Sequence, residues 1–466
     1  MVQEILRREA YLLASVRWNG QDGGMTNTWE ALPHAESEVV GLLRDLIQID
    51  TSNWGESAET VGEIVAADYC AERLREAGWS PEVFTTTSQN RAGVYLRVPG
   101  SDPAAPALLL HGHLDVVPAM ASEWSHPPFA AELDGGFVWG RGAVDMKDMD
   151  AMILAVVRGW GFTGIRPRRD VVVLFLPDEE AGSGHGAHWL AANRPEMFAG
   201  VSEAVGEVGG FSITVRDDLR IYPIQTAEKG IRWIRLEASG RAGHGSMLHD
   251  DNAITELCDA VSRIGKHQWP LRITKTVEMF LEGLGTAYGI ALDPHEPEEL
   301  LRILGTFGAV VGATMQNTSN PSMLNAGYKH NVIPSEAAAC IDGRVVPGYE
   351  DEFEATIREL VGERISVSTL VSDIALEAPF DTATVDLMAS VLRAEDPTAQ
   401  TLPYMMSGGT DAKAISQFGI DCYGFSPLQM PADVDYWRLF HGVDERVPVA
   451  GLQFGVRVLD RFLRAC

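Results

Sequence analysis

Hydrophobic residues along the first half of the chain follow two different patterns. Over 36–48 they recur every three or four positions, which predicts an amphipathic helix, and a second helix is expected over 59–77, with Gly78 ending it. Uninterrupted apolar runs are instead typical of buried strands. Three such runs and one further helix follow: strands over Val94–Val98, Ala107–Leu110 and Val171–Leu176, and a helix over Asp148–Trp160. Strands that alternate with helices predict an α/β fold with helices on the faces of a sheet.

The pattern changes after about Lys229. Alternating residues predict strands over Gly230–Ser239 and Ala337–Val345, with a helix over Ile254–Ile264, whereas 266–320 has no clear assignment. We therefore expect an inserted second domain over 229–348. The first domain would cover 31–228 and resume over 349–466, after an N-terminal extension over 1–30, in which Met25 could be the natural start.

Composition narrows the functional classes. Against 37 basic residues the chain has 65 acidic ones, a net charge of -28, which would repel the phosphates of a nucleic acid. The five cysteines are scattered without a CxxC pair, so we expect free thiols in a reducing cytoplasm. No apolar run reaches the length of about 18 residues that a membrane span requires, and none is expected.

Polar clusters follow two of the predicted strands directly. The run ending at Leu110 leads into His111-Gly-His-Leu-Asp115, and the run ending at Leu176 leads into Pro177-Asp-Glu-Glu180. In open α/β sheets, binding sites gather beyond the carboxyl ends of the strands. The catalytic groups are therefore expected at this edge.

Each candidate residue has an ordinary structural interpretation when it is considered alone. His113 and Asp115 could form a hydrogen-bonded pair, Asp145 could cap a helix, and Glu179 and Glu180 could be a solvated acidic pair. Glu207 could likewise lie on the surface, and His441 in a loop. Taken together, two histidines and three carboxylates suit Zn²⁺, and one carboxylate can bridge two ions. Two ions about 3.5–4 Å apart can activate a water between them, with a further carboxylate as general base.

The ordered set of motifs resembles the aminoacylase/carboxypeptidase/acetylornithine deacetylase superfamily of co-catalytic zinc metallopeptidases. The resemblance covers residues 36–460 and implies a zinc-peptidase-like catalytic domain, with a central mixed sheet flanked by helices, plus a smaller α+β lid and dimerisation domain. It is carried by these stretches: His111-Gly-His-Leu-Asp-Val-Val-Pro118, Glu123-Trp-Ser-His-Pro-Pro-Phe129, Trp139-Gly-Arg-Gly-Ala-Val-Asp-Met-Lys147, Pro177-Asp-Glu-Glu-Ala-Gly182, Gly206-Glu-Val-Gly-Gly210, Gly243-His-Gly-Ser246, Asn331-Val-Ile-Pro334, Asp342-Gly-Arg344 and Ser407-Gly-Gly-Thr-Asp411.

The resemblance also implies roles at the metal centre. His113 and Glu207 would bind one ion, Glu180 and His441 the other, and Asp145 would bridge both. Composition cannot distinguish the adjacent glutamates, so the assignment of Glu179 as general base rests on the resemblance. In the same way Asp115 would orient His113, and a cis peptide bond would follow Asp145. His111 does not occupy a ligand position and is expected to pack behind the site.

Substrate contacts follow from the same resemblance. Arg344 would bind a substrate carboxylate, and Asn331, Gly409 and Thr410 resemble positions that contact the same end of the substrate. His244 resembles a lid histidine that reaches the active site of a neighbouring subunit, which implies a homodimer formed through the lid domain. The alternatives are a structural salt bridge for Arg344 and a turn cap for His244.

We therefore expect an enzyme that hydrolyses the amide or peptide bond of an N-acyl amino acid or short peptide with a free carboxylate. Two divalent ions are expected, Zn²⁺ first, with Co²⁺ or Mn²⁺ compatible with the same ligands. A dipeptidase, a biosynthetic deacylase or a desuccinylase would use the same site. The alternative from another class is a non-catalytic, metal-binding regulatory protein.

Overall fold

The computed structural model describes residues 32–55, 57–290, 297–304 and 306–466. The expected N-terminal extension over 1–30, with Met25, lies outside the described residues.

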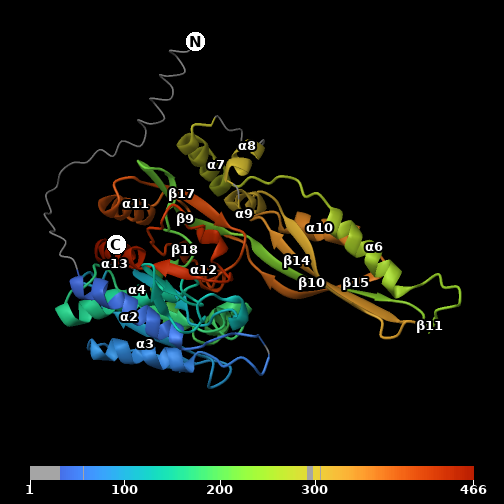
Figure 1. The fold of residues 1–466 in the computed structure, drawn as a ribbon, viewed down its shortest axis with the longest axis horizontal. Helices are drawn as coiled ribbons and strands as arrows, with labels where there is room; N and C mark the ends of the chain where they lie inside the picture. Colours follow the sequence, from blue (N-terminus) through green and yellow to red (C-terminus); the bar gives the residue numbers. More distant parts are fainter. Residues whose placement is uncertain (1–31, 56, 291–296, 305) are drawn as a thin grey trace, which may run out of the picture. The chain divides into compact units, whose positions relative to one another are not determined.

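A ten-stranded mixed sheet forms the larger part of the fold, in the order β1-β2-β6-β3-β7-β18-β9-β16, with β8 and β17 also pairing with β9 (Figure 1). β3 is parallel to β6 and β7, and β18 is parallel to β7, so these four strands end at the same edge. β3 and β6 are buried along their whole length, which explains their unbroken apolar sequences. The strands are β1 (Glu82–Thr85), β2 (Ala92–Val98), β3 (Ala107–His113), β6 (Val171–Leu176), β7 (Val201–Gly206), β8 (Ile213–Arg216), β9 (Leu219–Glu228), β16 (Leu376–Glu377), β17 (Ala399–Met406) and β18 (Asp421–Gly424).

Helices cover both faces of this sheet. On one face α2 (Pro33–Gln48), α3 (Ile64–Glu76), α4 (Lys147–Thr163), α11 (Ala383–Glu395) and α13 (Val449–Ala465) share the largest apolar core. On the other face α5 (Ala187–Asn193) and α12 (Ala412–Ser416) enclose a second core. The predicted α/β architecture and the helices expected over 36–48 and Asp148–Trp160 are confirmed, while the helix expected from 59 begins at Ile64.

A second, four-stranded antiparallel sheet has the order β12-β14-β10-β15. One of its faces packs against α6 (Ala253–Lys266) and α10 (Glu350–Val361) through an apolar core that includes Ile234, Leu236 and Phe353. β11 and β13 form a separate two-stranded antiparallel sheet, and β11 lies beyond the end of β10 (Figure 1). The strands are β10 (Gly230–Ser239), β11 (Gly243–His244), β12 (Thr318–Ala326), β13 (Val332–Ile333), β14 (Glu336–Val345) and β15 (Ile365–Asp373).

The small sheet continues past residue 348, where we expected the first domain to resume. β15 pairs with β10 along eight positions, and α10 packs against α6. Within the described residues of the unassigned stretch 266–320 there are three helices, α7 (Lys275–Tyr288), α8 (Glu298–Leu304) and α9 (Thr306–Thr314), and α7 packs against β17 of the large sheet. The division into domains remains a proposal, and this pairing favours a second boundary after Asp373.

Two chain segments lead directly from a strand of one sheet into a strand of the other, and they run side by side. β9 continues through Lys229 into β10, and β15 continues through Ile374 into β16, which pairs back onto β9. A Cβ atom on Gly230 would lie 3.1 Å from the carbonyl oxygen of Asp373, so the two segments are in close contact. This paired crossover carries the chain from one sheet to the other.

Three short strands complete the fold near the site: β4 (Glu132–Asp134), β5 (Phe137–Trp139) and β19 (Arg446–Pro448), paired in the order β19-β5-β4. All five cysteines are free, as predicted. In the described part of the chain, no helix combines the length and the apolar character that crossing a membrane requires.

Candidate metal centre and substrate pocket

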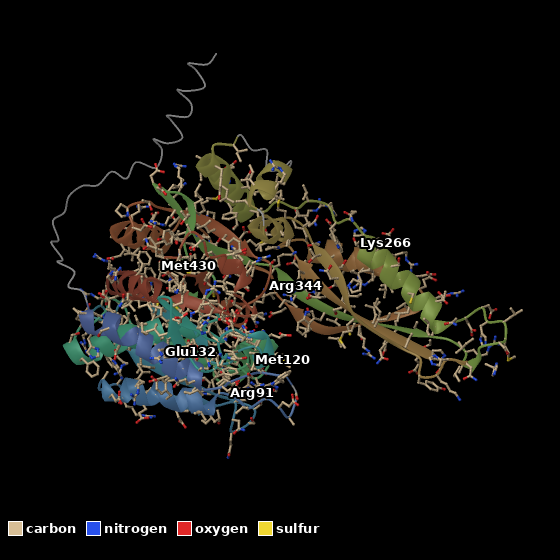
Figure 2. The ribbon with its side chains drawn as sticks, viewed as in Figure 1. Arg91, Met120, Glu132, Lys266, Arg344 and Met430 are labelled. Atoms are coloured by element: carbon tan, nitrogen blue, oxygen red, sulfur yellow. The ribbon has the colours of Figure 1, made fainter. Side chains whose placement is uncertain are left out.

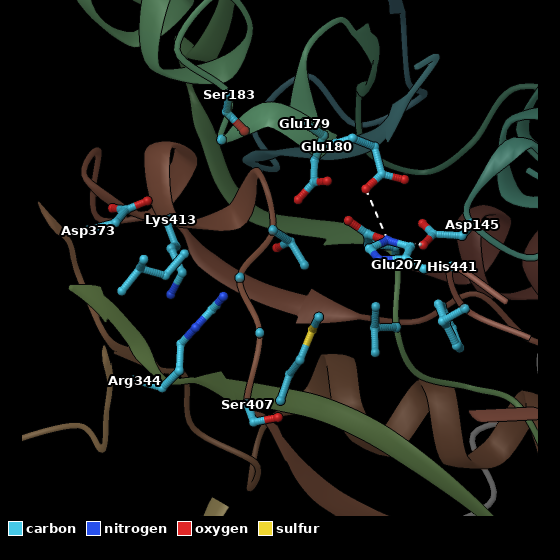
Figure 3. A pocket seen from close by; sticks show the side chains of 18 of the residues that line it. Asp145, Glu179, Glu180, Ser183, Glu207, Arg344, Asp373, Ser407, Lys413 and His441 are labelled. Atoms are coloured by element: carbon cyan, nitrogen blue, oxygen red, sulfur yellow. Dashed lines mark ion pairs between the residues drawn. The ribbon is translucent and has the colours of Figure 1, made fainter. Parts of the chain in front are cut away.

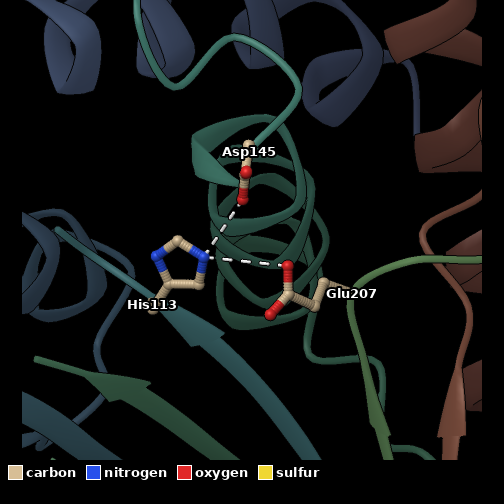
Figure 4. A group of neighbouring side chains, drawn as sticks. All are labelled: His113, Asp145 and Glu207. Carbon is tan, nitrogen blue, oxygen red and sulfur yellow. Dashed lines mark ion pairs between the residues drawn. The ribbon is translucent and has the colours of Figure 1, made fainter. Parts of the chain in front are cut away.

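One group of possible metal ligands forms where β3 and β7 end. His113 is the last residue of β3, Glu207 directly follows β7, and Asp145 lies in the turn before α4 (Figure 4). The Nε2 atom of His113 lies 3.3 Å from an oxygen of Asp145 and 3.7 Å from an oxygen of Glu207. All three residues are buried, and their ligand atoms lie within 4.8 Å of one another.

A second group shares Asp145 with the first. The Nε2 atom of His441 lies 3.2 Å from the other oxygen of Asp145 and 3.1 Å from an oxygen of Glu180 (Figure 3). Because one Asp145 oxygen faces His113 and the other faces His441, this carboxylate can contact two ions at once. The structure thus brings together all five predicted ligands.

The electrostatics of this cluster suit a divalent cation. Burial raises the pKa of Glu207 to about 7, and burial raises the pKa of Glu180 as well, because closely spaced carboxylates without solvent favour their protonated forms. Among the described residues, the buried Nε2 of His113 and Oε1 of Glu180 have no hydrogen-bond partner. Buried groups of this kind normally have one, so two ligand atoms are left for a cation.

Glu179 lies beside the metal ligands without belonging to either group. One of its oxygens lies 4.0 Å from His113 Nε2, and its side chain is 13% exposed. Burial, reinforced by the negative charge of Glu207, raises the pKa of Glu179 well above its usual value. A carboxylate in this position can exchange a proton with a molecule bound at the cluster.

Asp115 positions the two glutamates through its side chain and His113 through its main chain. Its carboxylate accepts hydrogen bonds from the backbone N–H groups of Glu179 and Glu180, both at 3.1 Å, and from the side chain of Asn53 at 2.8 Å. His113 Nδ1 donates to the backbone carbonyl of Asp115 at 2.9 Å, whereas the carboxylate is 3.6 Å away. The main chain of Asp115 thus fixes the ring of His113, and its side chain fixes the turn that carries Glu179 and Glu180.

Glu445, which the sequence did not single out, holds the turn that carries Asp145. It is fully buried and accepts hydrogen bonds from the backbone N–H groups of Gly142, Val144 and Asp145 at 2.7–3.1 Å. Arg141 donates to the same carboxylate at 2.6 Å. The cis peptide bond predicted between Asp145 and Met146 is present.

A pocket of about 400 Å³ extends from the metal ligands to the end of the small sheet that adjoins the large sheet. Arg344 lies at that end, where the small sheet meets the large one (Figure 2), and lines the pocket with Gly409 and Thr410 (Figure 3). Arg344 also donates two hydrogen bonds to Asp342, at 2.7 and 3.2 Å. The salt bridge considered as an alternative therefore exists, and the guanidinium faces the pocket as well.

Thr410 is less available to a ligand than we expected. Its hydroxyl donates to the buried carboxylate of Glu228 at 2.6 Å, and its backbone N–H donates to the same group at 3.0 Å. Lys413, also buried, lies 3.3 Å from Glu228 and donates to the carbonyl oxygens of Lys229 and Ile374, at 2.7 and 2.8 Å. The segment that carries Gly409, Thr410 and Lys413 is thus hydrogen-bonded to the paired crossover.

His244 and Asn331 lie at the opposite end of the small sheet from the pocket. Both are exposed: His244 ends β11, Asn331 directly precedes its partner strand β13, and the backbone N–H of Gly245 donates to the carbonyl of Asn331. β10 alone spans about 30 Å at roughly 3.3 Å per residue, so neither side chain reaches this chain's own metal ligands. His244 Nδ1 bonds to the Ser246 hydroxyl at 2.8 Å, which is the turn contact considered as the alternative.

His111 lies behind the metal ligands, as expected. Its ring fills the space beside Gly206, directly before Glu207, and is 3% exposed. Burial lowers the pKa of His111 to about 3, so the ring is neutral near pH 7.

An α/β sheet with two groups of histidine and carboxylate ligands at its carboxyl edge defines a metallohydrolase. Peptidase family M20/M25/M40 matches residues 109–465, and the chain belongs to this family. A probable carboxypeptidase S-like 2 of Dictyostelium discoideum is 30% identical over 75% of this chain and 70% of its own length, and aminoacylase-1 of Pongo abelii is 27% identical over 93% and 96%. An M20 family metallo-carboxypeptidase from Sulfolobus solfataricus has the same fold, with a TM-score of 0.71 at 18% identity, covering 92% of this chain and 98% of that one.

The expected class of enzyme is confirmed by these comparisons. The chain is a metal-dependent hydrolase of N-acyl amino acids or peptides, and its described residues provide ligands for a dinuclear centre.

Proposed function

We propose that this enzyme cleaves the amide bond next to the amino acid that carries the free carboxylate. The observation that carries the proposal is the position of Asp145, whose two oxygens face two separate sets of ligands. We assign His113 and Glu207 to one ion, Glu180 and His441 to the other, and Asp145 to both. The nitrogen and oxygen donors suit Zn²⁺, and Co²⁺ or Mn²⁺ would fit the same ligands.

Two such ions would lower the pKa of a water and polarise the scissile carbonyl. Glu179 is placed to accept the proton of that water, because it lies beside His113 and outside both ligand groups. It would then return the proton to the departing nitrogen. Asp115 keeps Glu179 in position through the backbone of the same turn.

Arg344 binds the substrate carboxylate in this proposal. Its fork of N–H donors faces the pocket while Asp342 fixes its orientation. Gly409 lines the same end, and Thr410 acts mainly by shaping the loop, since Glu228 holds its hydroxyl and its N–H.

A homodimer would explain the position of His244. The pairing of β11 with β13 holds this histidine far from its own pocket, so it could polarise a scissile carbonyl only in a partner subunit, with Asn331, next to β13, contacting the substrate there. The cytoplasmic location remains a prediction from the free cysteines.

The test is a hydrolysis screen by mass spectrometry with added Zn²⁺ or Co²⁺. It covers N-acetyl, N-succinyl and long-chain N-acyl amino acids together with dipeptides, so that it separates aminoacylase from dipeptidase specificity. Glu179→Gln should lower kcat by about 10³-fold or more while metal content stays unchanged, because only the proton acceptor is lost. Glu363→Gln, an exposed residue outside the pocket, is the matched control. Undiminished turnover by Glu179→Gln would refute its role, and no metal-dependent cleavage of any compound would refute the proposed function.

A further inference from the structure

The face of the small sheet that does not pack against α6 and α10 carries two rows of side chains at its pocket end. Across three neighbouring strands, Arg344, Ile231 and Asp373 lie directly opposite one another. Two residues further along, Asp342, Trp233 and Val371 form the next row. Because residues i and i+2 of a strand point to the same side, both rows face the same way.

Three apolar members of these rows, Ile231, Trp233 and Val371, line the pocket beside Arg344. We name them the apolar strip. Trp233 is 37% exposed. The core of the small sheet lies on the opposite face, so the Trp233 ring does not contribute to that core. A large aromatic side chain left open at a pocket wall is typical of a ligand contact.

We propose that the apolar strip binds the side chain of the amino acid whose carboxylate is held by Arg344, and that the enzyme prefers amino acids with large aromatic or long aliphatic side chains. This inference rests on the proposed function. The carboxylate and the side chain of an amino acid share one carbon atom, so they must bind close together. Ile231 lies about 5 Å from Arg344 across the strands, and Trp233 lies about 7 Å further along β10. The strip is therefore within reach of that side chain.

Asp373 does not turn this subsite into one for basic side chains. One of its oxygens accepts from the backbone N–H of Ile374 at 2.8 Å, and the other is 3.1 Å from Nε2 of His188. A cationic side chain would therefore compete with His188 for the charge of Asp373. An acidic side chain would be repelled by Asp373 and by Asp342 near it.

The test compares kcat/KM for N-acetylphenylalanine, N-acetylmethionine, N-acetylglycine and N-acetylaspartate on the Zn²⁺-loaded enzyme. We expect the first two to exceed the last two by about 30-fold or more, the range that apolar pocket contacts supply. Trp233→Ala should reduce the phenylalanine-to-glycine ratio by about 10-fold, and Trp233→Phe should preserve most of it. Met323→Ala, which removes another exposed apolar side chain from the same sheet outside this pocket, should leave the ratio unchanged.

Equal turnover of all four compounds, or an equal loss for all four in Trp233→Ala, would overturn the inference. If none of them is hydrolysed, the proposed function fails for this class, and calorimetric binding of free phenylalanine and glycine still tests the strip. If phenylalanine then binds no more tightly than glycine, the proposed role of the apolar strip is contradicted.

Discussion

The metal centre and the small sheet place their functional side chains in opposite ways. Around the metal centre, five ligands from separate segments converge within a few ångströms. Asp115 accepts hydrogen bonds from the turn that carries Glu180, and Glu445 accepts them from the turn that carries Asp145. On the small sheet, Arg344 lies at one end and His244 at the other, about 30 Å apart along β10. One chain therefore provides both groups of metal ligands, whereas in the proposed homodimer the small sheet would contribute to two pockets, its own and that of the partner subunit.

The largest effect is expected from the shared ligand. Asp145→Asn removes a charge that faces both histidines, so both ions should bind weakly, and activity should fall by about 10⁴-fold, equivalent to about 5 kcal/mol. His441→Ala should lose one ion only. Metal analysis by mass spectrometry distinguishes the two variants, and two ions retained by Asp145→Asn would show that the two ligand groups are independent.

The next-largest effect is expected at the paired crossover, where a substitution should lower the free energy of unfolding. Lys413→Met would leave the buried Glu228 without its cation and remove the donor from the carbonyls of Lys229 and Ile374. Breaking a buried pair in this way costs about 3–5 kcal/mol. Urea unfolding measures the loss, and the double variant with Glu228→Gln should be more stable than Lys413→Met alone. A double variant that is less stable would show that Lys413 acts independently of Glu228.

The far end of the small sheet can be tested by mixing subunits. His244→Ala should lower kcat by about 10²-fold, because one donor to the developing oxyanion is lost. When His244→Ala is mixed with Glu179→Gln and subunits exchange, half of the dimers are mixed and each has one intact site, so about a quarter of the activity should return. No recovery after verified exchange, or a fully active monomer in sedimentation, would remove the role across subunits.

The smallest effect is expected from Arg344, at the end of the small sheet that adjoins the pocket. Arg344→Ala should raise KM by about 30-fold, close to 2 kcal/mol, with little change in kcat, since the carboxylate contact is present before and during the reaction. The matched control is a substrate whose carboxylate is replaced by an amide. If the amide substrate loses as much as the acid, Arg344 supports the fold of the pocket and does not bind the carboxylate.

Local patterns in the sequence predicted that polar groups gather at one edge of the sheet, whereas the full set of metal ligands followed only from the family resemblance. His113 ends an apolar strand, Glu207 follows another, and parallel strands bring their carboxyl ends together. The sequence could not predict that β15 pairs with β10, because nothing local in 349–373 indicates a partner more than a hundred residues away, and this pairing favours a second boundary later than the predicted one. Glu445 and Lys413 were missed for the same reason: each acts on backbone groups that are distant in sequence.

The paired crossover has a consequence for the length of the substrate. Two hydrogen-bonded strands side by side form a ribbon, which bends across its flat face more readily than it shears or swivels. Lys413 donates one hydrogen bond to each segment between the sheets, at the carbonyl oxygens of Lys229 and Ile374. We therefore expect the distance between Arg344 and Asp145 to change little, because the crossover is held by Lys413 and also by the bonds of Lys229 Nζ to the carbonyl oxygens of Ala313 and Gln316. If Arg344 binds the substrate carboxylate as proposed, an enzyme built in this way would select its substrates by the distance between the scissile bond and that carboxylate, and a substrate with one extra residue between them would be cleaved more slowly.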